Sequence, residues 1–406
     1  GVLMKGPIKY FRSGGLTDLE NNGSLYEWAE GKAYLLIDQV AFRGHKGAVF
    51  CYYNPPVHQV GNPALDAYLQ GMDKVSEKKA DLGFLIFCGA NDPVHAGGDL
   101  KESLDRLDMT LETKKQMEED RASPEEIDRL FSWADDRLRK GITLHKKVRQ
   151  LARHLRVVSI CGGGTRFGGS AEIPLMADVL VGDSRSGMCF SEAMIGLIPG
   201  WSGLARALIK AGPANAAYMA MTGSEVKAPD LLAVGIYNAV VDIPFPFPGR
   251  ERSNDPDADK RRYLEALEAH DDETGRLLIP KGLEIATCPA VEIPEHDEKS
   301  RKTLAATDEI TAQVERRKDP RSYARLWGKP LKEVRDELKG LGRPLASQSI
   351  EALNALIGLY DPSDFDEHHF VKQEMEADAR LYRDPKFRAG LIATLEQRVA
   401  DYREAK

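Results

Sequence analysis

Short apolar runs alternate with helix-like stretches between about residues 83 and 242, and this alternation limits the possible folds more than any other feature. Apolar residues at 83–88 are followed by a charged helical stretch at 105–150, and those at 156–161 by a helix from Gly168. Strands that alternate with helices predict a mostly parallel, layered α/β sheet. Further strands are expected at 178–182 and 237–242, further helices at 62–79 and 203–222, and a hairpin over 33–43 and 48–53.

Composition shifts suggest four regions. Residues 1–32 are polar and glycine-rich and are expected to be a loosely packed lead-in to a core at 33–243, which carries a helical insertion at about 105–140. Proline and charge dominate from 244, which predicts a linker and helical insertion over 244–345 and a helical C-terminal region over 346–406. Candidate helices beyond 244 are 298–318, 321–340, 346–359 and 384–403.

The bulk properties narrow the function classes. The 406 residues carry a formal net charge of −7, so a nucleic-acid-coating protein is not expected. The five cysteines are widely spaced and form no CxxC, which argues against a disulfide framework and favours a reducing compartment. No apolar run reaches 18 residues and the first residues lack the apolar core of a leader. We therefore expect a cytoplasmic protein with no membrane partner.

Two glycine-rich stretches, 96–102 (AGGDLKE) and 161–172 (CGGGTRFGGSAE), each follow a predicted strand and precede a helix. Neither fits a dinucleotide fingerprint or a P-loop, because Phe167 and Gly169 occupy positions where those motifs require glycine and lysine. Each alone is equally compatible with a tight strand-to-helix turn. Together, at the ends of two adjacent parallel strands, they can aim backbone N–H groups at one developing negative charge.

Two glutamates accompany these stretches. Glu172 falls in the first turn of the helix after the second glycine stretch, where a residue that compensates the helix dipole is the commoner occupant. Glu192 lies in an otherwise apolar segment, where it is either a salt-bridge partner of Arg185 or Arg206 or a functional carboxylate. Two such groups in an apolar pocket would suit acid–base chemistry.

These motifs resemble the crotonase (enoyl-CoA hydratase/isomerase) superfamily. Phe87 to Glu102 is similar to the family's AGxDxxE loop, and residues 162–203 to its core signature of a glycine loop, Glu, Asp178 and a second Glu before PGxxG. The resemblance covers about 34–242, and weakly 375–402. It implies a ββα spiral core with two nearly perpendicular sheets, a largely helical C-terminal part used for oligomer contacts, and a homotrimer or dimer of trimers.

The resemblance also implies site residues and a reaction. Gly98 and Gly169 would supply the oxyanion-hole N–H groups, and Glu172 and Glu192 would be the acid–base pair that adds water to an α,β-unsaturated acyl-CoA. Neither a metal nor a separate cofactor is implied, since coenzyme A is part of the substrate. An isomerase, a thioester or ring-opening hydrolase, and a non-catalytic binding protein stay open as alternatives. The residues that would line the substrate are Ala96, Asp99, Lys101 and Trp201.

Several residues depart from the family pattern or have a simpler interpretation. Ser170 replaces a usual glycine, and His95 and Arg166 occupy positions that are usually small or apolar. An exposed helix position for Lys101 and core packing for Trp201 are plain alternatives to substrate contact. The pair His368–His369 invites a metal reading, but a solvated loop is favoured because no carboxylate or cysteine pattern supports a site.

Overall fold

The computed structural model describes residues 5–243, 253–288 and 301–403, and its chain divides into two compact units. Unit 1 comprises residues 1–97, 146–188 and 226–302; unit 2 comprises residues 98–145, 189–225 and 303–406. The first boundary falls inside the first glycine stretch, between Gly97 and Gly98. Each unit is described here by itself.

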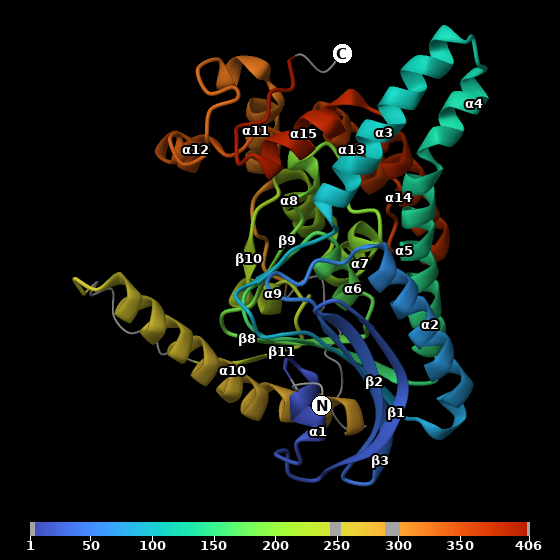
Figure 1. Ribbon diagram of the computed structural model, residues 1–406, viewed down its shortest axis with the longest axis vertical. Helices are drawn as coiled ribbons and strands as arrows, with labels where there is room; N and C mark the ends of the chain where they lie inside the picture. Colours follow the sequence, from blue (N-terminus) through green and yellow to red (C-terminus); the bar gives the residue numbers. More distant parts are fainter. Residues whose placement is uncertain (1–4, 244–252, 289–300, 404–406) are drawn as a thin grey trace. The chain divides into compact units, whose positions relative to one another are not determined.

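A seven-stranded sheet forms the centre of unit 1, in the order β1-β2-β3-β4-β6-β8-β11 (Figure 1). The first three strands pair antiparallel and the others pair parallel, which confirms the predicted mixed α/β class with a mainly parallel sheet. The strands are β1 (Leu19–Glu30), β2 (Ala33–Phe42), β3 (His45–Tyr53), β4 (Phe84–Cys88), β6 (Arg156–Cys161), β8 (Val179–Asp183) and β11 (Ala239–Val241).

A second sheet of four short strands has the order β10-β9-β7-β5. Within it β5 and β7 pair parallel, with Val94 opposite Thr165 and His95 opposite Arg166. Strand β5 directly precedes the first glycine stretch and β7 lies within the second, so the small sheet brings the two stretches together. The strands are β5 (Val94–His95), β7 (Thr165–Phe167), β9 (Gly187–Cys189) and β10 (Val226–Lys227).

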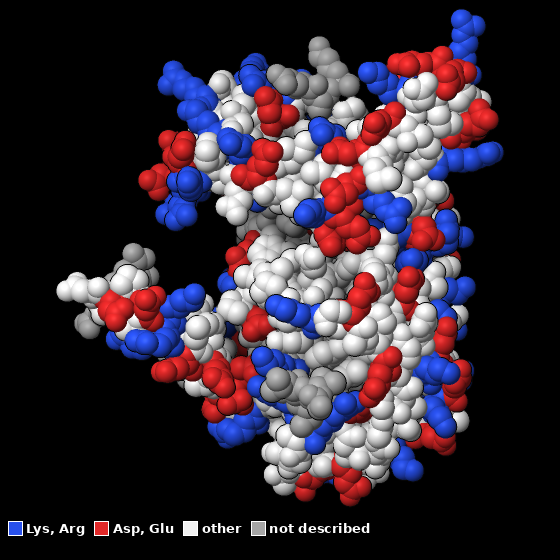
Figure 2. Space-filling model, in the orientation of Figure 1, with Lys and Arg blue, Asp and Glu red and all other residues white. Residues whose placement is uncertain are grey.

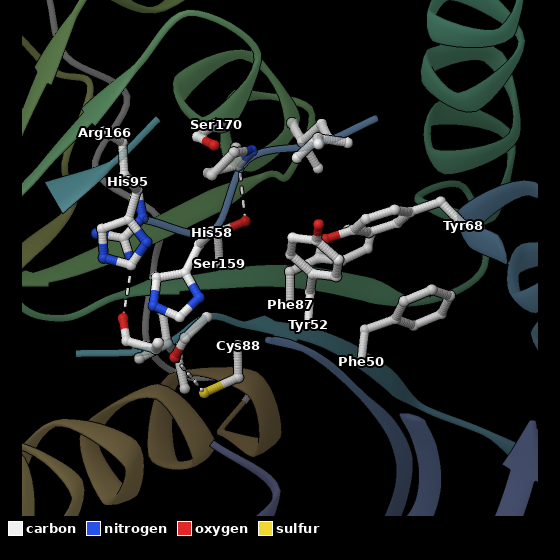
Figure 3. A pocket seen from close by; sticks show the side chains of 16 residues that line it. Phe50, Tyr52, His58, Tyr68, Phe87, Cys88, His95, Ser159, Arg166 and Ser170 are labelled. Carbon is white, nitrogen blue, oxygen red and sulfur yellow. Dashed lines mark hydrogen bonds between the residues drawn. The ribbon is translucent and has the colours of Figure 1, made fainter. Parts of the chain in front are cut away.

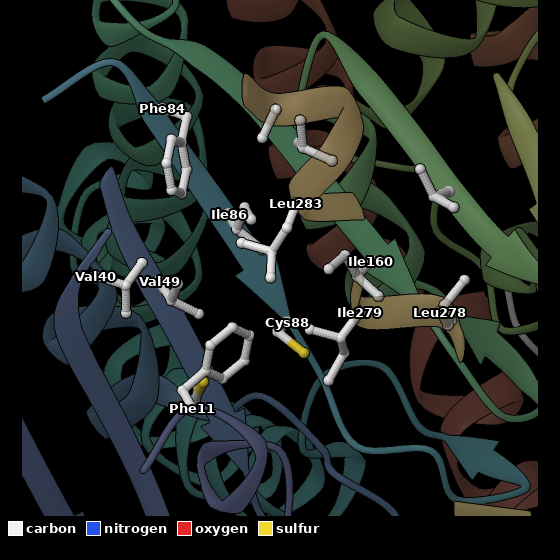
Figure 4. Close-up of a cluster of buried hydrophobic side chains, with 14 of the residues drawn as sticks. Phe11, Val40, Val49, Phe84, Ile86, Cys88, Ile160, Leu278, Ile279 and Leu283 are labelled. Carbon is white, nitrogen blue, oxygen red and sulfur yellow. The ribbon is translucent and has the colours of Figure 1, made fainter. Parts of the chain in front are cut away.

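Helices cover both faces of the large sheet, which explains why its parallel strands β4, β6 and β8 are continuous apolar runs and do not alternate. Phe11 of α1 (Ile8–Arg12) and Leu278, Ile279 and Leu283 of α10 (Pro256–Thr287) pack with Ile86 on one face (Figure 4). On the other face Tyr68 of α2 (Asn62–Lys78) stacks on Phe50 at 5.8 Å between ring centroids. Unit 1 also contains η1 (Lys79–Asp81), α6 (Gly169–Leu175) and α9 (Ala228–Ala233).

Unit 2 is largely helical. Helix α5 (Ser132–Leu151) begins in unit 2 and continues into unit 1. A capping box begins α4, with Ser123 Oγ accepting from the Glu126 N–H and the Glu126 carboxylate accepting from the Ser123 N–H. The other elements are α3 (Leu100–Glu119), α4 (Pro124–Asp128), η2 (Arg129–Phe131), η3 (Glu192–Met194), α7 (Gly203–Ala211), α8 (Pro213–Thr222), α11 (Thr307–Lys318), η4 (Pro320–Tyr323), α12 (Arg335–Leu341), α13 (Ser347–Gly358), α14 (Glu367–Tyr382) and α15 (Pro385–Leu395).

Some expectations were wrong. Residues 19–30 are not part of a loose lead-in, because they form β1 and pair with β2 along its length. The predicted linker and helical insertion at 244–345 contains a long helix at 256–287 that was not among the candidate helices, α14 was not anticipated, and 321–340 is mostly irregular. The part of the predicted linker at 244–252 and the start of the 298–318 helix lie outside the described residues.

The outward faces of the long helices are solvated. Figure 2 shows acidic and basic side chains interspersed along α3 and α10. Some form pairs one helical turn apart, such as Arg276 with Glu273 at 2.7 Å and Lys114 with Glu118 at 3.8 Å. Among the residues that the structure describes, no helix has the length and apolar character needed to span a membrane.

Candidate active site

The two glycine stretches meet inside unit 1. Strands β4 and β6, which precede them, are parallel neighbours, as predicted. A Cβ added to Gly97 would lie 3.1 Å from the Phe167 carbonyl oxygen and 3.3 Å from the Gly169 nitrogen, so only glycine fits without displacement there. The Ser170 hydroxyl donates to the carbonyl oxygen of Ala96. The serine that departs from the family pattern therefore fastens one glycine stretch to the other.

Helix α6 starts at Gly169, directly after Gly168, whose φ of 52° suits only glycine. The N–H groups of Ala171 and Glu172 both donate to the Gly168 carbonyl. Gly169 is buried, and within the described residues its own N–H has no hydrogen-bond acceptor. Because buried backbone donors are nearly always paired, this amide is a candidate for ligand binding. Glu172 lies in the first turn of the helix, as predicted, and is 3% exposed.

In unit 2 the first glycine stretch continues as Gly98 and then α3. Gly98 is half-buried, and in the described part of the chain its N–H also has no acceptor. The Asp99 carboxylate caps α3 by accepting from the Glu102 N–H at 3.0 Å. Lys101 is exposed on α3, in keeping with its simpler interpretation. Asp99 therefore has a structural task, whereas the contacts of Ala96, Asp99 and Lys101 with a substrate stay predictions.

Glu192 opens η3 in unit 2 and is 8% exposed. The loop after it is held by helix α14, because the buried Asp378 carboxylate accepts from the Ile198 N–H at 3.1 Å. Arg206, one of the two arginines considered for Glu192, forms an ion pair with Glu367 at 2.9 Å. Hydrogen bonds to this loop and to α7 therefore come from a helix that the sequence did not reveal.

Trp201 is 5% exposed and belongs to the same unit. A Cβ added to Gly141 of α5 would lie 2.0 Å from the Trp201 indole, so this glycine lets the helix approach the ring. The Arg137 guanidinium lies 5.7 Å from the centre of the indole. Trp201 is thus well packed, and this packing accounts for its burial whether or not it also lines an acyl pocket.

A cavity in unit 1 lies between the large sheet, α2 and α6 (Figure 3). Figure 3 shows His58, His95 and Arg166 at one end and the aromatic rings of Tyr52 and Tyr68 at the other. The cavity volume is about 60 Å³. A buried water needs roughly 10–15 Å³ of such space, so the cavity suits a few water molecules and is too small for an acyl chain.

The polar end of this cavity is electrostatically ordered. Burial, and then the charges of Arg166 and His58, lower the pKa of His95 well below its ordinary value of 6.5. His95 is therefore neutral, and its Nε2 has no hydrogen-bond partner in the described residues. Arg166 donates to the carbonyl oxygens of Gly162 at 3.0 Å and Ala90 at 3.5 Å.

His58 has a defined tautomer at the same end. Its Nδ1 accepts from the Asn54 N–H at 3.0 Å, so its Nε2 carries the proton and donates to Asp92 at 2.5 Å. Sequence reasoning missed His58, Asp92, Arg137 and Asp378. Only the departures at His95 and Arg166 were visible in the sequence as a sign of unusual chemistry beside the glycine stretches.

The histidine pair and the cysteines were the other candidates for a metal site or for reactive chemistry. His368 and His369 lie in the first turn of α14, so the predicted loop is wrong there. Within the described ranges, no group of three or more His, Cys, Asp or Glu side chains is arranged to hold a metal ion. The five cysteines are free, and burial raises the pKa of Cys88 to about 12. That thiol is consequently protonated and unreactive at neutral pH.

Part of the chain resembles a known family in sequence. Residues 139–243 match the sequence model of the "Enoyl-CoA hydratase/isomerase" family. The chain is 39% identical over 79 residues to the fatty acid oxidation complex subunit alpha of Idiomarina loihiensis, and 35% identical over 78 residues to the carnitinyl-CoA dehydratase of Proteus mirabilis. These matches cover 20% and 19% of this chain, and only 11% and 30% of the relatives.

The fold resembles a solved structure over a longer part of the chain. A crystal structure of an enoyl-CoA hydratase from Rhodobacter sphaeroides superposes with a TM-score of 0.51 at 15% identity, covering 89% of this chain and 90% of that one. At this identity the likeness concerns the fold alone. Together with the family match over 139–243 and the motifs, this likeness supports the crotonase resemblance that the sequence predicted.

Proposed function

We propose that the protein adds water across the double bond of an α,β-unsaturated acyl-CoA thioester. In this proposal the N–H groups of Gly98 and Gly169 bind the thioester oxygen and stabilise the enolate that forms when water attacks. Glu172 removes a proton from the attacking water, and Glu192 delivers a proton to the α-carbon; the two roles are interchangeable on present grounds. The water oxygen bonds to the β-carbon, and coenzyme A stays attached throughout. The reaction as proposed requires neither a metal nor a separate cofactor.

The observation that supports this proposal is the Gly169 amide, whose N–H has no acceptor within the described part of the chain. It is a buried donor at the start of α6, three residues before a buried carboxylate, in the segment that matches the hydratase/isomerase family. A donor of this kind is usually satisfied. A ligand oxygen that becomes negative during the reaction would satisfy it, and losing one such donor typically lowers the rate by about 10²–10³-fold.

The test is mass spectrometry of products after incubation with short, long, branched and cyclic enoyl-CoA esters. Hydration predicts a product heavier by one water, with coenzyme A attached. Glu172→Gln and Glu192→Gln should each lower kcat by about 10²–10⁴-fold, whereas Glu119→Gln on the exposed end of α3 should leave it unchanged. Release of free coenzyme A or an opened ring would indicate a hydrolase.

A shifted double bond with unchanged mass, lost with only one of the two glutamates, would indicate an isomerase. Binding without turnover of any ester would leave a non-catalytic binding protein.

We further propose the homotrimer or dimer of trimers that the family resemblance implies, and light scattering of the purified chain would measure its mass. A cytoplasmic location likewise stays a prediction.

A further inference from the structure

Arg137 is a buried cation that has no counter-ion among the residues that the structure describes. It lies on α5 in unit 2, inside the helical stretch that the family pattern does not explain, and it is 5% exposed. Its Nη1 donates to the Ser103 hydroxyl at 2.6 Å, and its Nε has no hydrogen-bond partner in the described residues. Among those residues Arg137 also forms no ion pair.

Such an arrangement is costly. A guanidinium removed from water loses its hydration, and one neutral hydroxyl replaces little of it. The nearby indole of Trp201 gives some cation–π stabilisation at 5.7 Å but cannot accept a hydrogen bond. Arginines at such depth are normally matched by a carboxylate or phosphate. The missing partner is therefore expected from a ligand.

The position of Arg137 tells which ligand. A Cβ added to Gly98 would lie 1.8 Å from Arg137 Nη2, so the guanidinium rests against the Cα of that glycine. Gly98 is a proposed donor to the thioester oxygen, and Trp201 was predicted to line the acyl group. Because Arg137 contacts Gly98 and lies beside Trp201, its guanidinium lies where the acyl group of the substrate is proposed to bind.

We propose that Arg137 binds a carboxylate on the acyl group, so that the substrates are enoyl-CoA esters of dicarboxylic acids. A planar guanidinium binds a carboxylate with two parallel hydrogen bonds, and the free Nε with an Nη supplies such a pair. This inference rests on the proposed function for the location of the acyl group. It adds the chemical class of the substrate and makes Arg137 a specificity residue supplied by the inserted helices.

The experiment compares two pairs of matched esters. Glutaryl-CoA and pentanoyl-CoA are saturated and differ in the terminal carboxylate, so calorimetric titration measures its binding without any reaction. Glutaconyl-CoA and 2-pentenoyl-CoA give the same comparison for kcat/KM. The wild-type protein should favour the carboxylate ester by about 10²-fold or more, as for a desolvated charge pair. Arg137→Met should abolish that preference, Arg137→Lys should keep part of it, and Arg139→Met, on the exposed face of α5, should keep all of it.

Three results would overturn the inference. These are a wild-type protein with no preference for the carboxylate, a preference that survives Arg137→Met, and an equal weakening of both esters by Arg137→Met. The last would mean that Arg137 meets a phosphate of coenzyme A or the thioester oxygen. If Arg137→Met fails to fold, the wild-type preference and Arg137→Lys still decide. A carboxylate preference without hydration of any ester would sink the hydratase proposal and leave the carboxylate site standing.

Discussion

Two buried arginines, one in each unit, solve the same electrostatic problem in different ways. Arg166 in unit 1 lies opposite the neutral His95 and donates to two backbone carbonyl oxygens. Arg137 in unit 2 donates to a single hydroxyl among the residues that the structure describes. Carbonyl dipoles supplied by the chain stabilise a buried charge without any ligand, whereas a guanidinium that lacks them is left for a substrate to complete. The comparison separates a cation that holds a loop from a cation that recognises a ligand.

The largest expected effect tests the premise that partners within the chain stabilise a buried charge. Glu374 of α14 is 0% exposed and accepts from the N–H groups of Leu204 at 3.0 Å and Ala205 at 3.3 Å. Glu374→Ala leaves both donors unpaired and should lower the free energy of unfolding by about 3 kcal/mol. Urea unfolding followed by circular dichroism measures it. If Glu374→Ala lowers the free energy of unfolding by less than the exposed control Glu376→Ala, partners within the chain do not stabilise this buried charge.

The difference between the two arginines predicts that replacing each of them by methionine changes the free energy of unfolding by a different amount. Arg166→Met leaves the carbonyl oxygens of Gly162 and Ala90 without a donor, while Arg137→Met removes an uncompensated charge and leaves a hydroxyl that can turn elsewhere. Arg166→Met should therefore reduce the free energy of unfolding by about 2 kcal/mol more than Arg137→Met. Both are measured without ligand by urea unfolding. Equal losses would mean that Arg137 is as structural as Arg166.

The neighbour of Arg166 predicts a pH dependence. Because burial and Arg166 lower the pKa of His95, the unfolded chain binds a proton near pH 6.5 that the folded chain does not. Stability is then full above pH 6.5 and lost as the pH falls, with a slope approaching about 1.4 kcal/mol per pH unit. His95→Asn should remove this slope between pH 6.5 and 5, and His369→Asn, exposed on α14, should not. Unfolding curves across that range that are unchanged by His95→Asn would contradict it.

The smallest effect concerns the contact between the glycine stretches. Ser170→Ala deletes the hydrogen bond to the Ala96 carbonyl and should lower the free energy of unfolding by about 1 kcal/mol. Thermal unfolding measures the loss of stability, and the enoyl-CoA assay measures any change in the hydration rate. The rate of enoyl-CoA hydration should fall less in Ser170→Ala than in Glu172→Gln or Glu192→Gln. A rate loss as large as that of Glu172→Gln would give Ser170 a direct role with the substrate.

Parts of the fold and site followed from sequence because they depend on local pattern. The strand at 156–161 has the predicted bounds, and the meeting of the glycine stretches followed from two parallel strands ending at one edge. The strand at 19–30 did not, because it is a polar edge strand containing Gly23 whose pairing with β2 decides its structure. Arg137 was invisible for a related reason, since its contact with Gly98 depends on how the inserted helices fold back on the glycine stretch.

Helix α10 decides where this chain can be cut. The family match ends at residue 243, which invites expression of the matched part alone. Yet Leu278, Ile279 and Leu283, beyond that end, share one apolar cluster with Ile86 and Ile160 of the sheet. A chain stopped at 243 would present those strands bare to solvent, as an adhesive surface. A piece that keeps the apolar face of the sheet in unit 1 covered must therefore extend at least to about Cys288, well beyond the end of the family match.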